Sequence, residues 1–208
     1  MDTMVDYKTL LTYGDFIPLK PRCSVNKLFD EIKIFDFAQY NPRKDIKRYG
    51  LSITSLRGEV NGIDLDSLLE IWKETGKMYT ESDFSTFTAV YNASSEIQNL
   101  IEPFKDHIAR SHILNLKPGG YFPPHRDTTV IKEPDDFRVI VPLKRCNPPD
   151  MYFMYEDKSL HFDHGRAYFL NTNKTHSVFS LNDSYFIVLN IKNNEDSIKL
   201  IGEHFLHI

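Results

Sequence analysis

The sequence has few cysteines and no segment long and apolar enough for a membrane helix. Its two cysteines, Cys23 and Cys146, lie far apart and lack the spacing of a metal site. We therefore expect free thiols in a reducing compartment. No apolar run approaches the roughly 18 residues of a membrane helix, and the first residues lack the basic start and apolar centre of a signal peptide. These absences predict a cytoplasmic protein without a membrane partner.

Clustered positive charge is also missing. The chain has 25 Lys and Arg residues against 29 Asp and Glu, a formal net charge of −4, and its basic residues are scattered. Nucleic-acid-binding proteins usually concentrate basic residues in one patch, so the charge pattern predicts no nucleic-acid partner. With 41% hydrophobic residues in 208, we expect a single domain over residues 1–208 with a substantial core. Composition leaves the oligomeric state open.

The first part of the chain, residues 1–109, indicates a helical and irregular support with one strand. Apolar residues at helical spacing predict three helices, over residues 24–37, 63–76 and 94–111. Asp64 or Asp66 is expected to cap the second helix, and Gly76 to end it. The third helix should break or kink near Pro103, which cannot donate a backbone hydrogen bond. The apolar segment 49–54 predicts the single strand.

From about residue 110 the pattern changes to short segments rich in branched and aromatic residues, separated by turn signals. Seven of them predict strands, over residues 111–117, 137–144, 151–156, 159–163, 166–171, 176–181 and 184–192. With the strand at 49–54 this is the strand number of a jelly roll, or double-stranded β-helix. We therefore expect an α+β, mainly β protein with a cupin-like barrel over 110–192 and a C-terminal extension over 193–208. Such a barrel has a mouth that can bind ligands.

A histidine and an aspartate stand two residues apart in the segment "YFPPHRDTTV", as His125 and Asp127. In an extended chain, residues i and i+2 point the same way, so the two side chains can reach one metal ion. His176, at the start of a later predicted strand, can supply a second imidazole. Two histidines and one carboxylate on one face of an ion leave positions open, which suits non-haem Fe(II) that activates dioxygen. A structural zinc site would be closed and would usually contain cysteine.

A His-x-Asp pair on its own is a common accident of sequence. The chain has a second copy, His161 and Asp163, which lies too close to His176 for several barrel strands to intervene. We interpret this second pair as part of a turn. Four more histidines have no partner at a useful spacing and are expected to be ordinary surface or helix residues: His107, His112, His204 and His207.

The C-terminal half resembles the Fe(II)- and 2-oxoglutarate-dependent oxygenases, over roughly residues 110–192. The resemblance rests on "GGYFPPHRD", "FRVIVPL" and "HFDHGRAYFLNTNKTHSVFSLNDSYFIVLNI". It is strongest to the aspartyl/asparaginyl β-hydroxylase and bacterial proline-hydroxylase-like group. It implies a double-stranded β-helix that holds Fe(II) and uses 2-oxoglutarate and dioxygen to hydroxylate a proline, aspartate or asparagine side chain, free or peptidyl. It also implies that His125, Asp127 and His176 are the iron ligands and catalytic residues.

The far carboxylate of 2-oxoglutarate requires a cation in such a site. The resemblance implies a basic residue on the strand after the distal histidine, but this chain has Phe186 there. Arg138 matches another arginine of the group and is our candidate, because a guanidinium pairs with a carboxylate through two hydrogen bonds. Arg166 and Lys192 are the reserves. Loss of Arg138 is therefore expected to weaken 2-oxoglutarate binding and to spare iron.

Two other functions fit the same residues. One is a cupin-like metal enzyme that does not use 2-oxoglutarate, and the other is a non-enzymatic jelly-roll binding module with an incidental His-Asp pair. In the first half of the chain, Arg43, Arg48 and Tyr49 surround a strand start. They could hold a substrate carboxylate at the barrel mouth, or simply form a surface connector.

Overall fold

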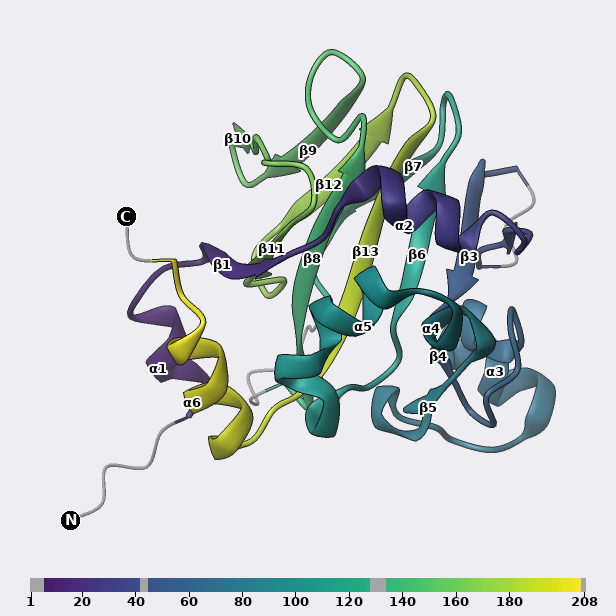
Figure 1. The fold of residues 1–208 in the computed structure, drawn as a ribbon, viewed down its shortest axis with the longest axis horizontal. Coiled ribbons are helices and arrows are strands. Elements are labelled where there is room, and N and C mark those ends of the chain that lie inside the picture. The colour runs from purple at the N-terminus through teal and green to yellow at the C-terminus, as the bar shows by residue number, and fades with distance from the viewer. Residues whose placement is uncertain (1–5, 42–44, 128–133, 207–208) are drawn as a thin grey trace.

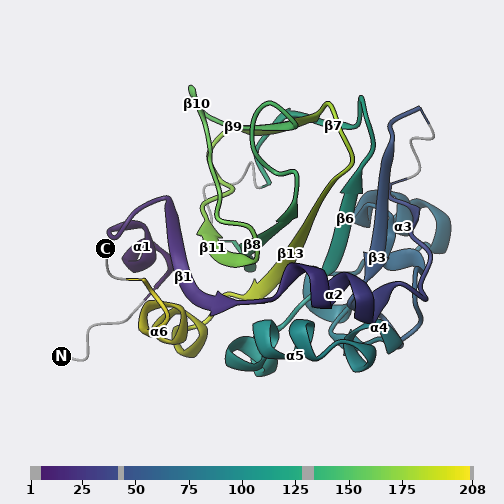
Figure 2. The same cartoon turned by 45° about the horizontal axis from the view of Figure 1, so that its top comes forward.

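The structure is a computed structural model that describes residues 6–41, 45–127 and 134–206. Two antiparallel sheets pack face to face (Figures 1 and 2). The larger sheet contains, in spatial order, β1 (Phe16–Arg22), β11 (Arg166–Leu170), β8 (Asp136–Lys144), β13 (Ser184–Lys192), β6 (His112–Leu116), β3 (Arg48–Ser52) and β2 (Ala38–Gln39). The smaller sheet contains β10 (Lys158–Ser159), β9 (Met151–Tyr155), β12 (His176–Ser180) and β7 (Tyr121–His125).

Helices cover the outer face of the larger sheet, opposite the smaller sheet (Figure 2). The α-helices are α1 (Tyr7–Leu11), α2 (Val25–Ile32), α3 (Leu68–Thr75), α4 (Ala89–Ala93), α5 (Ser95–Ile101) and α6 (Glu195–Glu203). The short elements are the ribbon β4 (Thr54–Ser55) with β5 (Thr86–Phe87), and the 3₁₀ turns η1 (Ile63–Leu65), η2 (Glu81–Asp83) and η3 (Glu102–His107). None of the helices within the described residues is long and apolar enough to cross a bilayer.

The period-two alternation of each strand divides the interior into two layers. Along β8, Phe137, Val139 and Val141 belong to the core between the larger sheet and the helices. Their neighbours Arg138 and Ile140 instead point into the space between the two sheets, where they line a cavity. The larger sheet therefore has a dry, helix-covered face and an inner face that can carry functional groups.

Two helix boundaries follow the sequence prediction. Gly76 caps α3 in a left-handed conformation, with φ of 69°, which glycine adopts without steric cost. The third predicted helix breaks where expected, since α5 gives way to the 3₁₀ turn η3 that contains Pro103. Local breaker residues are thus reliable guides to where these helices end.

The predicted cap of α3 is wrong. Ser67, not Asp64 or Asp66, occupies the N-cap, and its hydroxyl accepts a hydrogen bond from the Glu70 N–H. Asp64 instead lies in η1, fully buried, where its carboxylate accepts a hydrogen bond from Ser52 on β3. Asp64 therefore makes a tertiary contact and does not cap the helix, although aspartate is a residue type that favours helix caps.

The prediction of one strand before residue 110 is also wrong, because the described part of that region contains five, β1 to β5. The segment expected at 49–54 is present as β3, paired with β6. The missed strand β1 contains Pro18 and Pro21, which cannot donate to a β-ladder. Prolines are tolerated on edge strands, and β1 is the edge strand of the larger sheet, paired with β11 and joined on its other side by an isolated bridge from Leu19 to Phe205.

The strand predicted over 159–163 is mostly irregular, because β10 ends at Ser159. The side chain of Asn147 satisfies the backbone there: it accepts a hydrogen bond from the Phe162 N–H at 2.8 Å and donates one to the Phe162 carbonyl at 2.9 Å. The C-terminal extension, for which we predicted no element, contains α6. Its cap is Asn194, which accepts a hydrogen bond from the Ser197 N–H.

Candidate metal centre

The structure brings together His125, Asp127 and His176, the three residues that the sequence predicts to be metal ligands. His125 ends β7 and lies directly opposite His176, which begins β12. Residues paired across a sheet project to the same face, so both imidazoles point inward. Asp127 follows two residues later, and its N–H donates to the carbonyl of Thr172 at 3.0 Å. Residues distant in the sequence thereby meet at one end of the smaller sheet.

The ligand atoms face one another. Nε2 of His125 lies 3.4 Å from Oδ1 of Asp127, and Nε2 of His176 lies 3.8 Å from the same oxygen. All three ligand atoms lie within 4.8 Å of one another. An ion bound at about 2.1 Å spaces neighbouring ligands about 3 Å apart, so small side-chain movements would complete the site. Within the described residues, this is the only group of three metal-ligating side chains this close together.

Backbone carbonyls orient both imidazoles. Nδ1 of His125 lies 2.7 Å from the carbonyl oxygen of Pro123, and Nδ1 of His176 lies 3.0 Å from that of Lys174. In each case the carbonyl two residues earlier holds the Nδ1 proton, which leaves the lone pair of Nε2 directed at the site. Metal-ligating histidines characteristically have such a partner on the second nitrogen. The donor set therefore fits a metal ion.

Arg138, on the neighbouring strand β8, orients the carboxylate. Its Nε donates to Oδ2 of Asp127 at 3.1 Å, which leaves Oδ1 directed at the histidines, and its Nη1 donates to Asp136 at 2.6 Å. Burial alone would raise the pKa of Asp127, but Arg138 and the two histidines hold that pKa far below its usual range. The carboxylate is ionised and ready to bind a cation. Burial raises the pKa of Asp136 to about 6 despite the same arginine.

Replacing Arg138 with methionine is expected to lower Fe(II) affinity about 10–100-fold, because Asp127 would lose the partner that orients it. This revises the expectation that loss of Arg138 spares iron. Anaerobic titration calorimetry with Fe(II) measures the effect. Arg166→Met is a matched control, since Arg166 lies on the adjacent strand β11 and pairs at 3.3 Å with the exposed Asp163, away from the triad. Wild-type affinity in Arg138→Met would show that Asp127 keeps its orientation without the arginine.

Two adjoining cavities meet at the candidate metal centre. The inner cavity, of about 130 Å³, lies between the sheets and is lined by the triad together with mostly apolar side chains. The outer cavity, of about 650 Å³, adjoins the inner cavity at Asp127 and Arg138 and is lined by residues that include Tyr7, Tyr79 and Glu81. Asp127, Arg138 and Thr172 line both. A ligand in either cavity would therefore lie beside the carboxylate of the triad.

Several other predicted residues lie elsewhere. The second His-x-Asp copy is apart from the triad, with His161 exposed. Arg166 donates to the carbonyl of Leu19 and does not line the inner cavity, nor does Lys192. Arg48 is buried with its guanidinium 4.4 Å from the ring centre of Phe122, so it is not a surface connector. Arg43 lies outside the described residues.

The expectation that His112 is a surface or helix histidine is wrong. It lies on β6, is 3% exposed, and lines the inner cavity with the triad. Burial, and then the nearby Arg110 and Arg138, hold its pKa well below the usual histidine value. No local spacing signals this position, because only the pairing of β6 with β3 and β13 turns the side chain inward.

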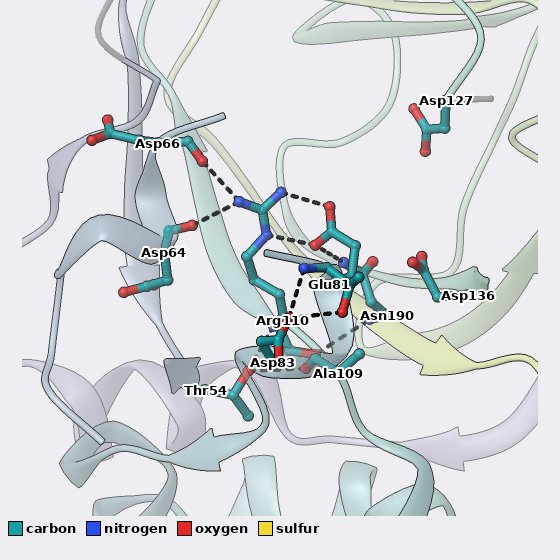
Figure 3. Close-up of polar contacts among 12 residues, drawn as sticks. Thr54, Asp64, Asp66, Glu81, Asp83, Ala109, Arg110, Asp127, Asp136 and Asn190 are labelled. Carbon is teal, nitrogen blue, oxygen red and sulfur yellow. Dashed lines mark hydrogen bonds and ion pairs between the residues drawn. The ribbon is translucent and has the colours of Figure 1, made fainter. Parts of the chain in front are cut away.

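A buried ion pair beside the two cavities was also missed by the sequence analysis (Figure 3). Arg110 donates to both carboxylate oxygens of Glu81, at 2.6 and 2.7 Å, and its Nη1 reaches the backbone carbonyls of Asp64 and Asp66. Asn190 donates to the same Glu81 carboxylate at 3.1 Å. This network joins β13, η1, η2 and the segment before β6 around the wall of the candidate site.

No protein-family model matches the chain, and no curated protein matches it either. Among solved structures, HygX from Streptomyces hygroscopicus, with nickel and 2-oxoglutarate bound, aligns with a TM-score of 0.54 and 10% identity, over 90% of this chain and 87% of that chain. A prolyl-4-hydroxylase from Pseudomonas putida aligns with a TM-score of 0.47 and 10% identity, over 88% and 95%. The likeness to HygX shows the fold and confirms the predicted double-stranded β-helix.

Proposed function

We propose that the protein is an Fe(II)- and 2-oxoglutarate-dependent dioxygenase that hydroxylates an amino-acid or peptidyl side chain. The observation that carries the proposal is the convergence of His125, Asp127 and His176, with their ligand atoms within 4.8 Å of one another at a cavity inside the barrel. A facial set of two histidines and one carboxylate is typical of iron sites that leave positions open for other ligands. The likeness of the fold to a protein with nickel and 2-oxoglutarate bound supports the same assignment.

The residues of the chain have separable roles in this proposal. His125, Asp127 and His176 would hold the ion, whose chemistry with dioxygen and 2-oxoglutarate supplies the oxidising power, with succinate and carbon dioxide as by-products. Arg138 holds Asp127, and within the described part of the chain its Nη2 makes no hydrogen bond, so it remains available to a ligand carboxylate. The surrounding apolar wall would keep water from the reacting groups.

The outer cavity is the proposed substrate site, since it opens directly on Asp127 and has room for an amino-acid residue. The resemblance to the aspartyl/asparaginyl β-hydroxylase and proline-hydroxylase-like group suggests a proline, aspartate or asparagine side chain. Succinate release over a panel of free amino acids and of Pro-, Asp- and Asn-containing peptides would identify it. A panel in which no member raises succinate release above the uncoupled background would contradict this substrate class.

Anaerobic spectroscopy tests the function directly. Addition of Fe(II) and then 2-oxoglutarate to the purified protein is expected to produce the weak visible charge-transfer band of a chelated keto acid, with one iron per chain. His161→Ala is the matched control and should show the same band, because His161 is exposed and apart from the triad. Metal binding without a band would favour a cupin-like metal enzyme, and no metal binding would favour a jelly-roll binding module.

A further inference from the structure

The inner cavity contains two buried polar atoms that lack a hydrogen-bond partner among the described residues. One is Nδ1 of His112, a residue that is 3% exposed. The other is Oδ1 of Asn190, which is 1% exposed and whose Nδ2 donates to Glu81. Both side chains line the cavity that the metal triad lines. Buried polar atoms in folded proteins are almost always paired, so both atoms should have partners. The amide oxygen of Asn190 can only accept and needs a donor such as water, whereas Nδ1 of His112 can donate to a ligand in this space.

Packing alone does not explain a histidine at position 112. The side chain lies on the inner face of β6, opposite Ser52 on β3 and Val188 on β13. The next inward residue on the same strand, Leu114, is apolar and is packed in the core between the sheets. The imidazole contacts the ring of Tyr40, with 5.0 Å between ring centres. An apolar ring would make the same contact with Tyr40 and would leave no buried nitrogen unpaired. The contact with Tyr40 therefore does not account for an imidazole at this position.

The charge of the inner cavity favours an anionic ligand. Of its described lining residues, Arg110 and Arg138 are cationic, and Asp127 is the only carboxylate. A divalent ion on the triad would add further positive charge. All three guanidinium nitrogens of Arg110 donate to other residues, and Arg138 binds Asp127 and Asp136, so within the described residues only Nη2 of Arg138, beside the metal ligand Asp127, makes no hydrogen bond. The two arginines would attract an anion electrostatically. The end of that anion that lies away from the metal would still need a separate hydrogen-bond donor.

Among the described residues that line the cavity, Nδ1 of His112 is a fully buried nitrogen without a hydrogen-bond partner. On β13 the positions that face the cavity are Phe186, Val188 and Asn190, two apolar residues and a neutral amide whose Nδ2 already donates to Glu81, so the base that the resemblance implies on this strand is absent. His112 lies directly across from Val188 on the neighbouring strand. Its ring is neutral near pH 7, since burial and the two arginines lower its pKa, and a neutral imidazole has one N–H to donate.

We infer that His112 is a binding residue for the far carboxylate of a small keto diacid that extends from the metal centre into the barrel, with Nδ1–H as the donor. The inference rests on the proposed function and deepens it, because it replaces the missing base near Phe186 with a neutral hydrogen bond. The cavity of about 130 Å³ has room for several water-sized groups, which is the scale of a five-carbon diacid.

Two keto acids of equal length distinguish the loss of a ligand contact at His112 from a structural effect of replacing this residue. 2-Oxoglutarate has the far carboxylate, and 2-oxopentanoate lacks it. In anaerobic titrations of the Fe(II) protein, His112→Leu is expected to weaken 2-oxoglutarate about 10-fold or more, the cost of a lost hydrogen bond to a charged group. Its affinity for 2-oxopentanoate and for Fe(II) should stay within about twofold of wild type. His112→Gln, which keeps a donor, should recover part of the 2-oxoglutarate affinity.

Equal losses for the two keto acids would overturn the inference and make His112 a structural residue. No loss for either would show that the cavity atoms are satisfied by water alone. His161→Leu is the matched control, as the same substitution at an exposed histidine, and should change neither affinity. If the leucine variant does not fold, His112→Phe retains an aromatic ring against Tyr40.

A metal-free measurement keeps the inference separate from the proposed function. If the wild-type protein gives no charge-transfer band, the oxygenase proposal fails, but the carboxylate site can still be tested with glutarate. Glutarate is expected to raise the melting temperature of the metal-free wild type and not that of His112→Leu. An equal shift in both proteins, or none in the wild type, would contradict a carboxylate site at His112.

Discussion

Replacing His176 with alanine is expected to lower Fe(II) affinity by more than about 100-fold and to abolish hydroxylation. Loss of a group that only orients a ligand costs about 10–100-fold, so loss of a ligand should cost more. Only His125 and Asp127 would remain, and the facial geometry would be gone. The side chain of His176 is 8% exposed and its ring stacks on that of Phe153, at an interplanar angle of 10°.

Anaerobic titration with Fe(II), followed by 2-oxoglutarate, measures this loss through the charge-transfer band. The metal-free variant should retain the β-rich circular dichroism of the wild type, which would show that the loss is local. The melting temperature of the wild type should rise with Fe(II), while that of the variant should not, because only a folded site binds the ion. Undiminished iron binding in His176→Ala would exclude the triad as the metal centre.

Replacing Arg110 with alanine is expected to reduce the free energy of unfolding by about 3–5 kcal/mol, the largest stability effect that we predict. The change leaves the Glu81 carboxylate, which is 14% exposed, without its charged partner. It also removes the donor for the carbonyls of Asp64 and Asp66. In a chain of this size, the melting temperature should fall by roughly 6–20 °C. Thermal and urea denaturation both report this loss.

An exposed ion pair provides the control for Arg110. Lys73 pairs with Glu70 at 2.7 Å, but its side chain is 55% exposed. Lys73→Ala should therefore change stability by no more than about 0.5 kcal/mol. The double variant Arg110→Met with Glu81→Leu should recover much of the stability lost in Arg110→Ala, because no unpaired charge stays buried. A double variant less stable than the single one would mean that the pair contributes net stability.

The contrast between these two ion pairs illustrates what tertiary structure adds to residue type. In the sequence, Arg110 and Lys73 are both cations near acidic residues. The structure buries Arg110 just before β6 and leaves Lys73 on the surface of α3. Charge burial depends on which strands lie beside each other, and this cannot be deduced from neighbours in the chain.

The clearest prediction from local pattern was the group of potential ligands. Residues two apart in an extended segment point the same way, which predicted that His125 and Asp127 could reach one ion, and the structure places Asp127 two residues after the end of β7. His176 was found by a longer argument, that a strand returning from a distant part of the barrel would bring a second imidazole. The register of β12 against β7 places it directly opposite His125. Their role as metal ligands stays a prediction until an ion is measured.

Residue patterns along the chain were sufficient for the β-rich core, the break near Pro103 and the end of α3 at Gly76, because alternation and breaker residues act over a few neighbours. The inward position of His112 and the contact of Arg138 with Asp127 were decided only by the folded barrel. Both depend on register between strands that are far apart in the sequence, and register is selected by the packing of whole sheet faces.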